Sequence, residues 1–327
     1  MTFRHFLSWK PLFYNGLLPA LRMLGPTRGD AILGGLGRVT ALWPWRRREL
    51  HLALMRLRSA TGSVWEIPAK RAALEANVFR YLARDCQLDG ASDEDFFGRF
   101  DVQGFEHLQE ALKQGRGVIL VGSHLGAHLS ANHWIYRQGL AQKLLTQRPQ
   151  RLSRYQSDKY DFADDPNPQS GFFLKRNLPP GEAAKRIFRT RKALRNGEIV
   201  YLTGDVPWTG PNTRPARFLG HRLTFLSLWA EFAALFGATV VMVFCTHQPG
   251  GRHALTFEPL GTIEHGEEGE AVERYIRRLE EQIVAHPEDA VAHLLWSCYG
   301  PPVEVGDDRK ETARRATRRQ VPTAHPS

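Results

Sequence analysis

Apolar residues recur every three or four positions in several stretches of the chain, with polar residues between them. This period is that of an amphipathic helix, which buries one face. We therefore expect two helices between residues 48 and 86, and single helices over residues 106–114, 182–196, 225–236 and 271–284. Gly115, Gly197 and Gly237 follow three of these stretches, where a glycine commonly ends a helix.

Short and unbroken apolar runs lie between the expected helices. Residues 117–122 read Gly-Val-Ile-Leu-Val-Gly, and residues 199–203 and 239–245 are similar runs. Such a run indicates a strand that is buried on both faces of a sheet, and the alternating residues 252–260 indicate a further strand. Because strands and helices alternate along the chain, we expect an α/β fold with a mainly parallel central sheet flanked by helices.

The N-terminal segment differs from the rest of the chain. Its apolar stretches, residues 12–24 and 31–45, are broken by charges and by Pro26, so neither reaches the roughly 18 to 20 apolar residues that span a bilayer. Trp43 and Trp45 stand beside the arginine run 46–48, an arrangement suited to the headgroup zone of an anionic membrane. The alternative is a helical hairpin that packs on the domain.

These patterns predict three parts. Residues 1–48 form an N-terminal helical segment that associates with the membrane, and residues 49–303 form the α/β domain. Residues 304–327 are basic and poor in apolar side chains, which predicts a disordered tail. The loop over residues 151–181 is polar and rich in Pro, Gly and Asp, and we expect it to lie over the active face.

Charge and cysteine content narrow the choice of partner and compartment. The formal net charge of +10 favours a polyanionic partner, or reflects only a basic solvated surface. Cys86, Cys245 and Cys298 are far apart and form no metal or disulfide pattern, and no signal peptide is apparent, so we expect a reducing compartment. The chain carries no recognisable nucleic-acid-binding motif, and we expect no nucleic-acid partner.

Candidate chemistry lies directly after two of the expected strands. Functional groups in α/β sheets gather past the carboxyl ends of strands, and His124 and Asp205 both follow such ends. A histidine there can act as a general base, and Gly122 and Gly126 would let the backbone approach an acyl carbonyl. The alternative is a histidine that caps the next helix or is satisfied in the core. His128 lies four residues after His124, but no zincin glutamate separates them, so we expect no metal.

Several blocks resemble one family in the same order. Residues 117–129, Gly-Val-Ile-Leu-Val-Gly-Ser-His-Leu-Gly-Ala-His-Leu, are similar to the signature block of the lipid A late acyltransferases, a branch of the lysophospholipid acyltransferase superfamily. Residues 182–205 resemble that family's arginine-rich helix, strand and Asp-Gln block. Residues 217–243 resemble its later glycine, helix and strand block, and residues 275–296 resemble its C-terminal helix and tryptophan-rich segment. Together the blocks cover roughly residues 10 to 300.

The resemblance implies an acyltransferase of lipid A-type biosynthesis that needs no cofactor. The acyl donor would be an acyl-carrier protein or coenzyme A thioester, and the acceptor a hydroxyl or amine of a lipid or glycolipid. The implied location is the cytoplasmic face of the inner membrane. An arginine of the family, thought to hold the substrate or stabilise the oxyanion, falls near Arg151 and Arg154, with Arg176 a weaker candidate. These cations could equally be solvated loop residues.

The sequence departs from the family pattern at the acid that accompanies the histidine. The acid is expected five residues after His124, where this chain has Leu129, and Asp205 is followed by Val206 in place of glutamine. We expect Asp205 to replace the missing acid and to lie within hydrogen-bond reach of His124. The alternatives are a His124 that works unaided, with the rate coming from positioning, and a protein that binds acyl chains without turnover.

Overall fold

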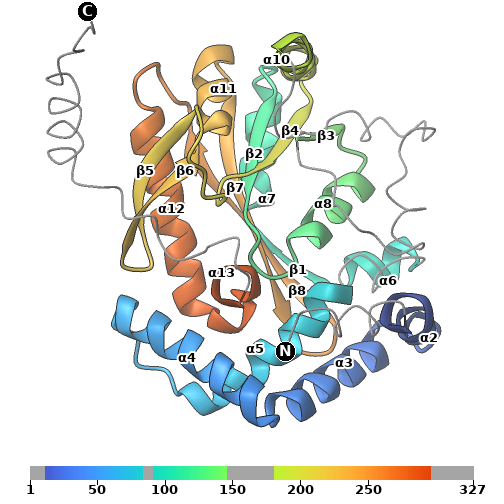
Figure 1. The fold of residues 1–327 in the computed structure, drawn as a ribbon. Helices are drawn as coiled ribbons and strands as arrows, with labels where there is room; N and C mark the ends of the chain where they lie inside the picture. Colours follow the sequence, from blue (N-terminus) through green and yellow to red (C-terminus); the bar gives the residue numbers. More distant parts are fainter. Residues whose placement is uncertain (1–11, 84–90, 146–179, 296–327) are drawn as a thin grey trace, which may run out of the picture.

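Strand β2 (Val118–Gly122) is buried at every position and lies within a six-stranded sheet. The computed structural model describes residues 12–83, 91–145 and 180–295. The strand order is β1–β8–β7–β2–β4–β3, and every neighbouring pair is parallel except β7 and β8. The other strands are β1 (Phe100–Gln103), β3 (Gln142–Leu144), β4 (Ile199–Thr203), β7 (Thr239–Gln248) and β8 (Arg252–Gly261). The predicted mainly parallel sheet is confirmed (Figure 1).

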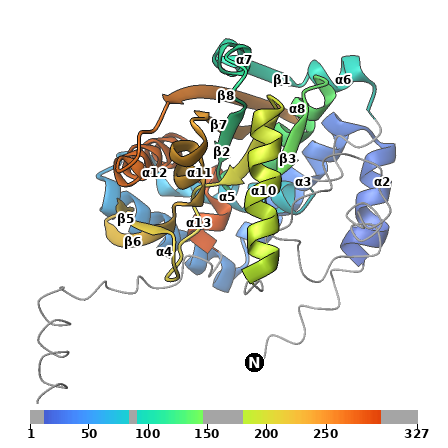
Figure 2. The ribbon, with the colours of Figure 1, turned by 90° about the horizontal axis from the view of Figure 1, so that it is seen from above.

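Helices cover both faces of this sheet (Figure 2). On one face, α7 (Phe105–Lys113) and α8 (His128–Arg137) contribute Leu108 and Trp134 to a core shared with the strands, beside the short α6 (Asp93–Phe97). On the other face, α11 (Leu228–Phe236) and α12 (Glu268–Ala285) contribute Trp229 and Tyr275 to the second core. Helix α10 (Pro180–Arg195) joins that core through two residues of its last turn.

A layer of N-terminal helices lies below the sheet in the view of Figure 1. It comprises η2 (Phe13–Leu17), α2 (Leu18–Met23), α3 (Pro26–Ala41), α4 (Pro44–Thr61) and α5 (Ile67–Ala83). Helices α3 and α5 can approach closely because a side chain at Gly37 would overlap the backbone of Ala76. The predicted boundary after residue 48 lies inside α4, and the division into parts stays a prediction. Within the described ranges, none of the helices has the length and apolar character to cross a bilayer.

Two partly buried ion pairs join the helices of this layer. Arg46 of α4 bonds Glu75 of α5 through Nε at 2.8 and 2.9 Å, and Arg80 of α5 bonds Asp30 of α3 at 2.6 and 3.0 Å. The side chain of Arg46 is only 16 % exposed. The sequence suggested the arginine run 46–48 for membrane headgroups. Arg46 is bonded within the protein, whereas Arg47 and Arg48 are exposed.

The sequence-based prediction was wrong at the start of the helix over residues 225–236. Phe225 and Leu226 end strand β6 (His221–Leu226), which pairs antiparallel with β5 (Thr213–Phe218), and α11 begins only at Leu228. A continuous apolar run does not distinguish strand from helix, and here the hairpin extends into it. Leu219 and Gly220 form its two-residue turn, both with positive φ of 50° and 81°. Phe225, Trp229 and Phe232 are buried in the core on this side of the sheet.

The remaining predicted elements are confirmed with small shifts at their ends. Strand β1 was not predicted, because its four residues are too short a run to show a period. The predicted loop over residues 151–181 lies almost wholly, and the tail 304–327 entirely, outside the described residues. After α12 the chain continues through η4 (Pro287–Asp289) and α13 (Val291–Leu295), which pack beneath the carboxyl ends of the strands.

Candidate active site

The pairing of two parallel strands brings His124 and Asp205 together. In the β2–β4 register Gly122 is opposite Thr203, and the Gly204 N–H donates to the Gly122 carbonyl at 2.9 Å. His124 and Asp205 each lie two residues beyond this last pair. They therefore leave the sheet at the same level and on neighbouring strands, which is the arrangement that parallel strands produce at their carboxyl edge.

His124 and Asp205 make two hydrogen bonds. His124 Nδ1 lies 2.9 Å from Asp205 Oδ1, and the His124 backbone N–H donates to Asp205 Oδ2 at 2.6 Å. The expectation that Asp205 lies within hydrogen-bond reach of His124 is confirmed. The two side chains differ in accessibility, because His124 is 35 % exposed and Asp205 is fully buried.

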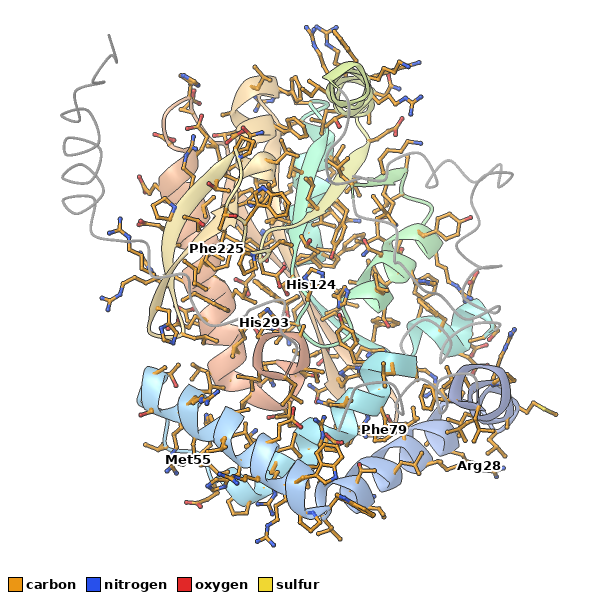
Figure 3. The ribbon with its side chains drawn as sticks, viewed as in Figure 1. Arg28, Met55, Phe79, His124, Phe225 and His293 are labelled. Atoms are coloured by element: carbon orange, nitrogen blue, oxygen red, sulfur yellow. The ribbon has the colours of Figure 1, made fainter. Side chains whose placement is uncertain are left out.

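A third residue completes this cluster. His293 of α13 places Nε2 2.9 Å from Asp205 Oδ2, and its side chain is fully buried. His124 and His293 are labelled together near the centre of Figure 3. The sequence analysis included residue 293 only within the C-terminal segment and gave it no role. No local signal marks it, because α13 is only five residues long and reaches the site through the tertiary fold.

The charge state of Asp205 follows from its partners. Burial alone would raise the pKa of this carboxyl, but the charge and hydrogen bonds of His124, together with those of His293, hold its pKa well below the ordinary value of 3.8. Asp205 is therefore ionised at neutral pH, and its oxygens only accept hydrogen bonds. His124 Nδ1 must carry a proton in this contact, so Nε2 is the nitrogen that can exchange a proton with a substrate.

The loop between β2 and α8 is held by backbone contacts. Gly126 N–H donates to the Asp289 carbonyl at 3.0 Å, Ala127 N–H to the Cys245 carbonyl at 2.8 Å, and Leu125 N–H to Ser123 Oγ at 3.2 Å. These N–H groups are thereby engaged within the protein. An anion in the site would therefore need donors from elsewhere than residues 124–127.

The two glycines predicted to bind substrate have structural reasons to be glycine. Gly126 has φ +52°, and a side chain there would meet the Cys245 carbonyl oxygen at 2.5 Å. A side chain at Gly122 would overlap the ring of Tyr201. Both glycines thus let other parts of the protein pack closely against the backbone. A contact with the acyl carbonyl stays a prediction for both.

A second histidine–aspartate pair lies beside the first. His247 Nδ1 is 2.6 Å from Asp289 Oδ1, and Asn77 Nδ2 donates to the same oxygen at 3.0 Å. Both members of the pair are buried, with side chains 5 % and 1 % exposed. The pair joins β7, α5 and the C-terminal segment. Because a substrate cannot reach so buried an imidazole, we assign the pair no chemistry.

The other candidates from the sequence are His128, a metal site and three arginines. His128 begins α8, is buried, and has its ring centroid 5.3 Å from that of His124 and 5.4 Å from that of Tyr81. The described part of the chain contains no group of His, Cys, Asp and Glu side chains arranged to hold a metal ion. Arg151, Arg154 and Arg176 lie outside the described residues, so their predicted role in substrate binding is untested.

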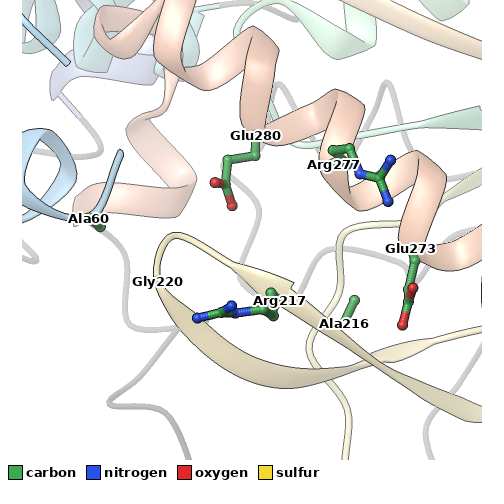
Figure 4. A pocket seen from close by; sticks show the side chains of 7 residues that line it. All are labelled: Ala60, Ala216, Arg217, Gly220, Glu273, Arg277 and Glu280. Atoms are coloured by element: carbon green, nitrogen blue, oxygen red, sulfur yellow. The ribbon is translucent and has the colours of Figure 1, made fainter. Parts of the chain in front are cut away.

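A surface pocket of about 440 Å³ lies away from this cluster, between the β5–β6 hairpin and α12 (Figure 4). It includes neither His124 nor Asp205. Charges of both signs line it, and Glu280 already accepts the Leu219 N–H at 2.7 Å. Its lining residues are Ala60, Ala216, Arg217, Gly220, Glu273, Arg277 and Glu280. Such a mixed and open lining does not suit an acyl chain, and we assign the pocket no part in the reaction.

Comparison with known proteins supplies the context for this geometry. The family described as "Bacterial lipid A biosynthesis acyltransferase" matches residues 1–154 and 173–292. The matched ranges contain His124, Asp205 and the β2 and β4 strands that carry them, but end one residue before His293. No curated protein matches the chain at a significant level.

Proposed function

Because this chain belongs to the bacterial lipid A biosynthesis acyltransferases, we propose that His124 and Asp205 carry its acyl transfer. The chain is an acyltransferase by family. The proposed reaction moves a fatty acyl group from an acyl-carrier protein or coenzyme A thioester to a hydroxyl or amine of a lipid or glycolipid of lipid A type. The observation that carries the proposal is the 2.9 Å contact of His124 Nδ1 with a buried carboxylate at adjacent strand ends.

The roles of the two residues follow from their protonation. His124 Nε2 accepts the proton of the acceptor hydroxyl as its oxygen attacks the thioester carbonyl carbon. The imidazolium that forms is stabilised by the ionised Asp205 at Nδ1, which also fixes the tautomer. When the tetrahedral intermediate collapses, the carbon–sulfur bond breaks and His124 returns the proton to the leaving thiolate. The products are an ester and a free thiol, and the base is regenerated.

The oxyanion of the intermediate requires donors that the loop after β2 does not supply from residues 124–127. A guanidinium from Arg151, Arg154 or Arg176 is the proposed donor, because a planar fork binds phosphate and anionic oxygen well. The same cations would suit the phosphates of the donor's pantetheine arm or of the acceptor. These assignments rest on the sequence.

A non-catalytic acyl-chain binder is the alternative function. This alternative was suggested by the missing acid at residue 129. The contact of Asp205 with His124 supports catalysis instead, because it places another acid beside the histidine. The test supplies wild-type protein with a labelled acyl-carrier-protein or coenzyme A thioester and measures label in the lipid fraction. Acyl-chain binding without transfer to any lipid acceptor would favour the binder.

We expect Leu129→Glu to leave activity within about threefold of the wild-type value. Leu129 is half-buried on the first turn of α8, and His124 Nδ1 already faces Asp205, so a second carboxylate adds no orienting contact. The measurement is kcat of acyl transfer by the variant, with its melting temperature as a control for folding. A rise of about tenfold or more would mean that Asp205 does not serve as the orienting acid.

We further propose that the α3–α4 junction attaches the protein to the cytoplasmic face of the inner membrane. Val39, Leu42, Trp43 and Trp45 expose 68, 71, 62 and 53 % of their surface there. Exposed Arg38, Arg47 and Arg48 flank them. Aromatic and apolar side chains beside cations suit the interface of an anionic membrane, and the junction lies at the lower edge of the molecule in Figure 1.

The membrane proposal predicts sedimentation of the protein with anionic vesicles at low salt and partial release at high salt, because part of the attachment is electrostatic. Trp43→Ser with Trp45→Ser should weaken vesicle binding by about tenfold or more, since two large apolar side chains are lost. Val64→Ser, at a residue 94 % exposed after α4, is the matched control. Wild-type protein that stays in the supernatant at low salt would contradict the proposal.

A further inference from the structure

The carboxylate of Asp205 is held on both oxygens. Oδ1 accepts from His124 Nδ1, while Oδ2 accepts from the His124 backbone N–H at 2.6 Å and from His293 Nε2 at 2.9 Å. A buried carboxylate with a single contact could rotate about its last bond. Donors on both sides fix its plane, so the direction of Oδ1 is set by what binds Oδ2.

His293 is itself held rigidly. Its side chain is fully buried, and Phe218 of the β5–β6 hairpin contacts it with ring centroids 5.9 Å apart. It lies on the short helix that follows η4, and η4 is anchored by Asp289, whose carbonyl accepts from Gly126 and whose carboxylate bonds His247. One short C-terminal segment, residues 287–295, thus contacts both the carboxylate and the loop that carries His124.

We propose that His293 is a positioning residue for the acyl transfer: it fixes the Asp205 carboxylate so that Oδ1 meets His124 Nδ1. This inference rests on the proposed function and deepens it. His293 cannot touch the substrate, because it is fully buried and its Nε2 faces Asp205. Its effect reaches the reaction through the orientation and tautomer of His124.

Two amide substitutions separate the hydrogen bond from the bulk of the side chain. In His293→Gln the amide nitrogen falls close to the position of Nε2 and can still donate to Asp205 Oδ2. His293→Asn carries the same amide on a chain one methylene shorter, so it does not reach. We expect the Asn variant to lose about 10- to 100-fold in kcat with KM within about threefold, and the Gln variant to retain most of kcat.

The tautomer of His124 gives a readout that needs no activity. In protein labelled with ¹⁵N-histidine, the wild type and His293→Gln should show His124 as the Nδ1–H tautomer at a pH where the ring is neutral. His293→Asn should show a mixture of both tautomers. The signals of His124 are assigned by their absence in His124→Ala. Should the Asn variant fail to fold, His293→Leu replaces it with the same expected results.

The results for the two variants decide between a positioning role of His293 and a merely structural one. Equal kcat loss in folded Gln and Asn variants, or wild-type kcat in the folded Asn variant, would overturn the positioning role. An unchanged His124 tautomer in the Asn variant would overturn it as well. If the wild-type protein transfers no acyl group, the proposed function fails, while the tautomer comparison still decides whether His293 orients the pair.

Discussion

Replacing His124 with alanine should lower acyl transfer by about 10²- to 10⁴-fold, the usual contribution of a positioned general base. The fold should survive, because the side chain is 35 % exposed and the bond from the residue-124 backbone N–H to Asp205 does not need the ring. The measurement is transfer of labelled acyl groups from carrier-protein and coenzyme A thioesters into the lipid fraction. Melting temperature and vesicle binding are followed in parallel.

The matched control for this experiment is His265→Ala. His265 is a histidine outside the site, and its side chain is 99 % exposed, so its loss should change neither activity nor folding. An active His124→Ala protein would remove His124 from the role of base. Wild-type protein without transfer, together with a His124→Ala variant that binds acyl chains equally well, would favour the non-catalytic binder.

The fold could be predicted where single elements carry a strong local pattern. The run from Val118 to Gly122 is unbroken because the strand is covered on both faces, so burial is visible in the sequence itself. The β5–β6 hairpin was missed because its second strand runs directly into an apolar helix. Ser227 alone between them does not separate the strand period from the helix period. Only the strand pairing with residues 213–218 distinguishes them.

The candidate site, too, could be predicted only in part from the sequence. Contact between His124 and Asp205 could be predicted, because both follow buried parallel strands, and such strands end at one edge. His293 could not be predicted, since its place depends on how the segment after α12 folds beneath that edge. The ion pair of Arg46 could not be predicted for a related reason, because its partner Glu75 lies on the next helix. Long-range pairing of polar groups leaves no period in the sequence.

Replacing Asp205 with asparagine should cost about 10²- to 10⁴-fold in kcat. The carboxylate accepts from His124 Nδ1, from the His124 backbone N–H and from His293 Nε2, whereas an amide has one acceptor oxygen and an NH₂ group that must face a donor. His124 would then favour the tautomer with its proton on Nε2, which is no longer a base. In the Ser-His-Asp triad the same change costs about 10⁴ for that reason.

The Asp205→Asn change should also alter stability in a pH-dependent way. The pKa of Asp205 is depressed in the folded protein, so its ionised form stabilises the fold fully above the unfolded value of 3.8, and this stabilisation is lost as pH falls through the folded pKa. At neutral pH the variant should be less stable by on the order of 3 kcal/mol, because buried donors lose their acceptor.

Chemical unfolding of both proteins from pH 7 to below pH 3 tests this linkage. The difference in free energy of unfolding should shrink below about pH 4, because only the wild type then takes up a proton on Asp205 as it unfolds. A difference that shrinks already between pH 7 and 5 would mean that Asp205 is not held ionised by His124 and His293. The carboxylate would then be protonated too readily to orient a base at neutral pH.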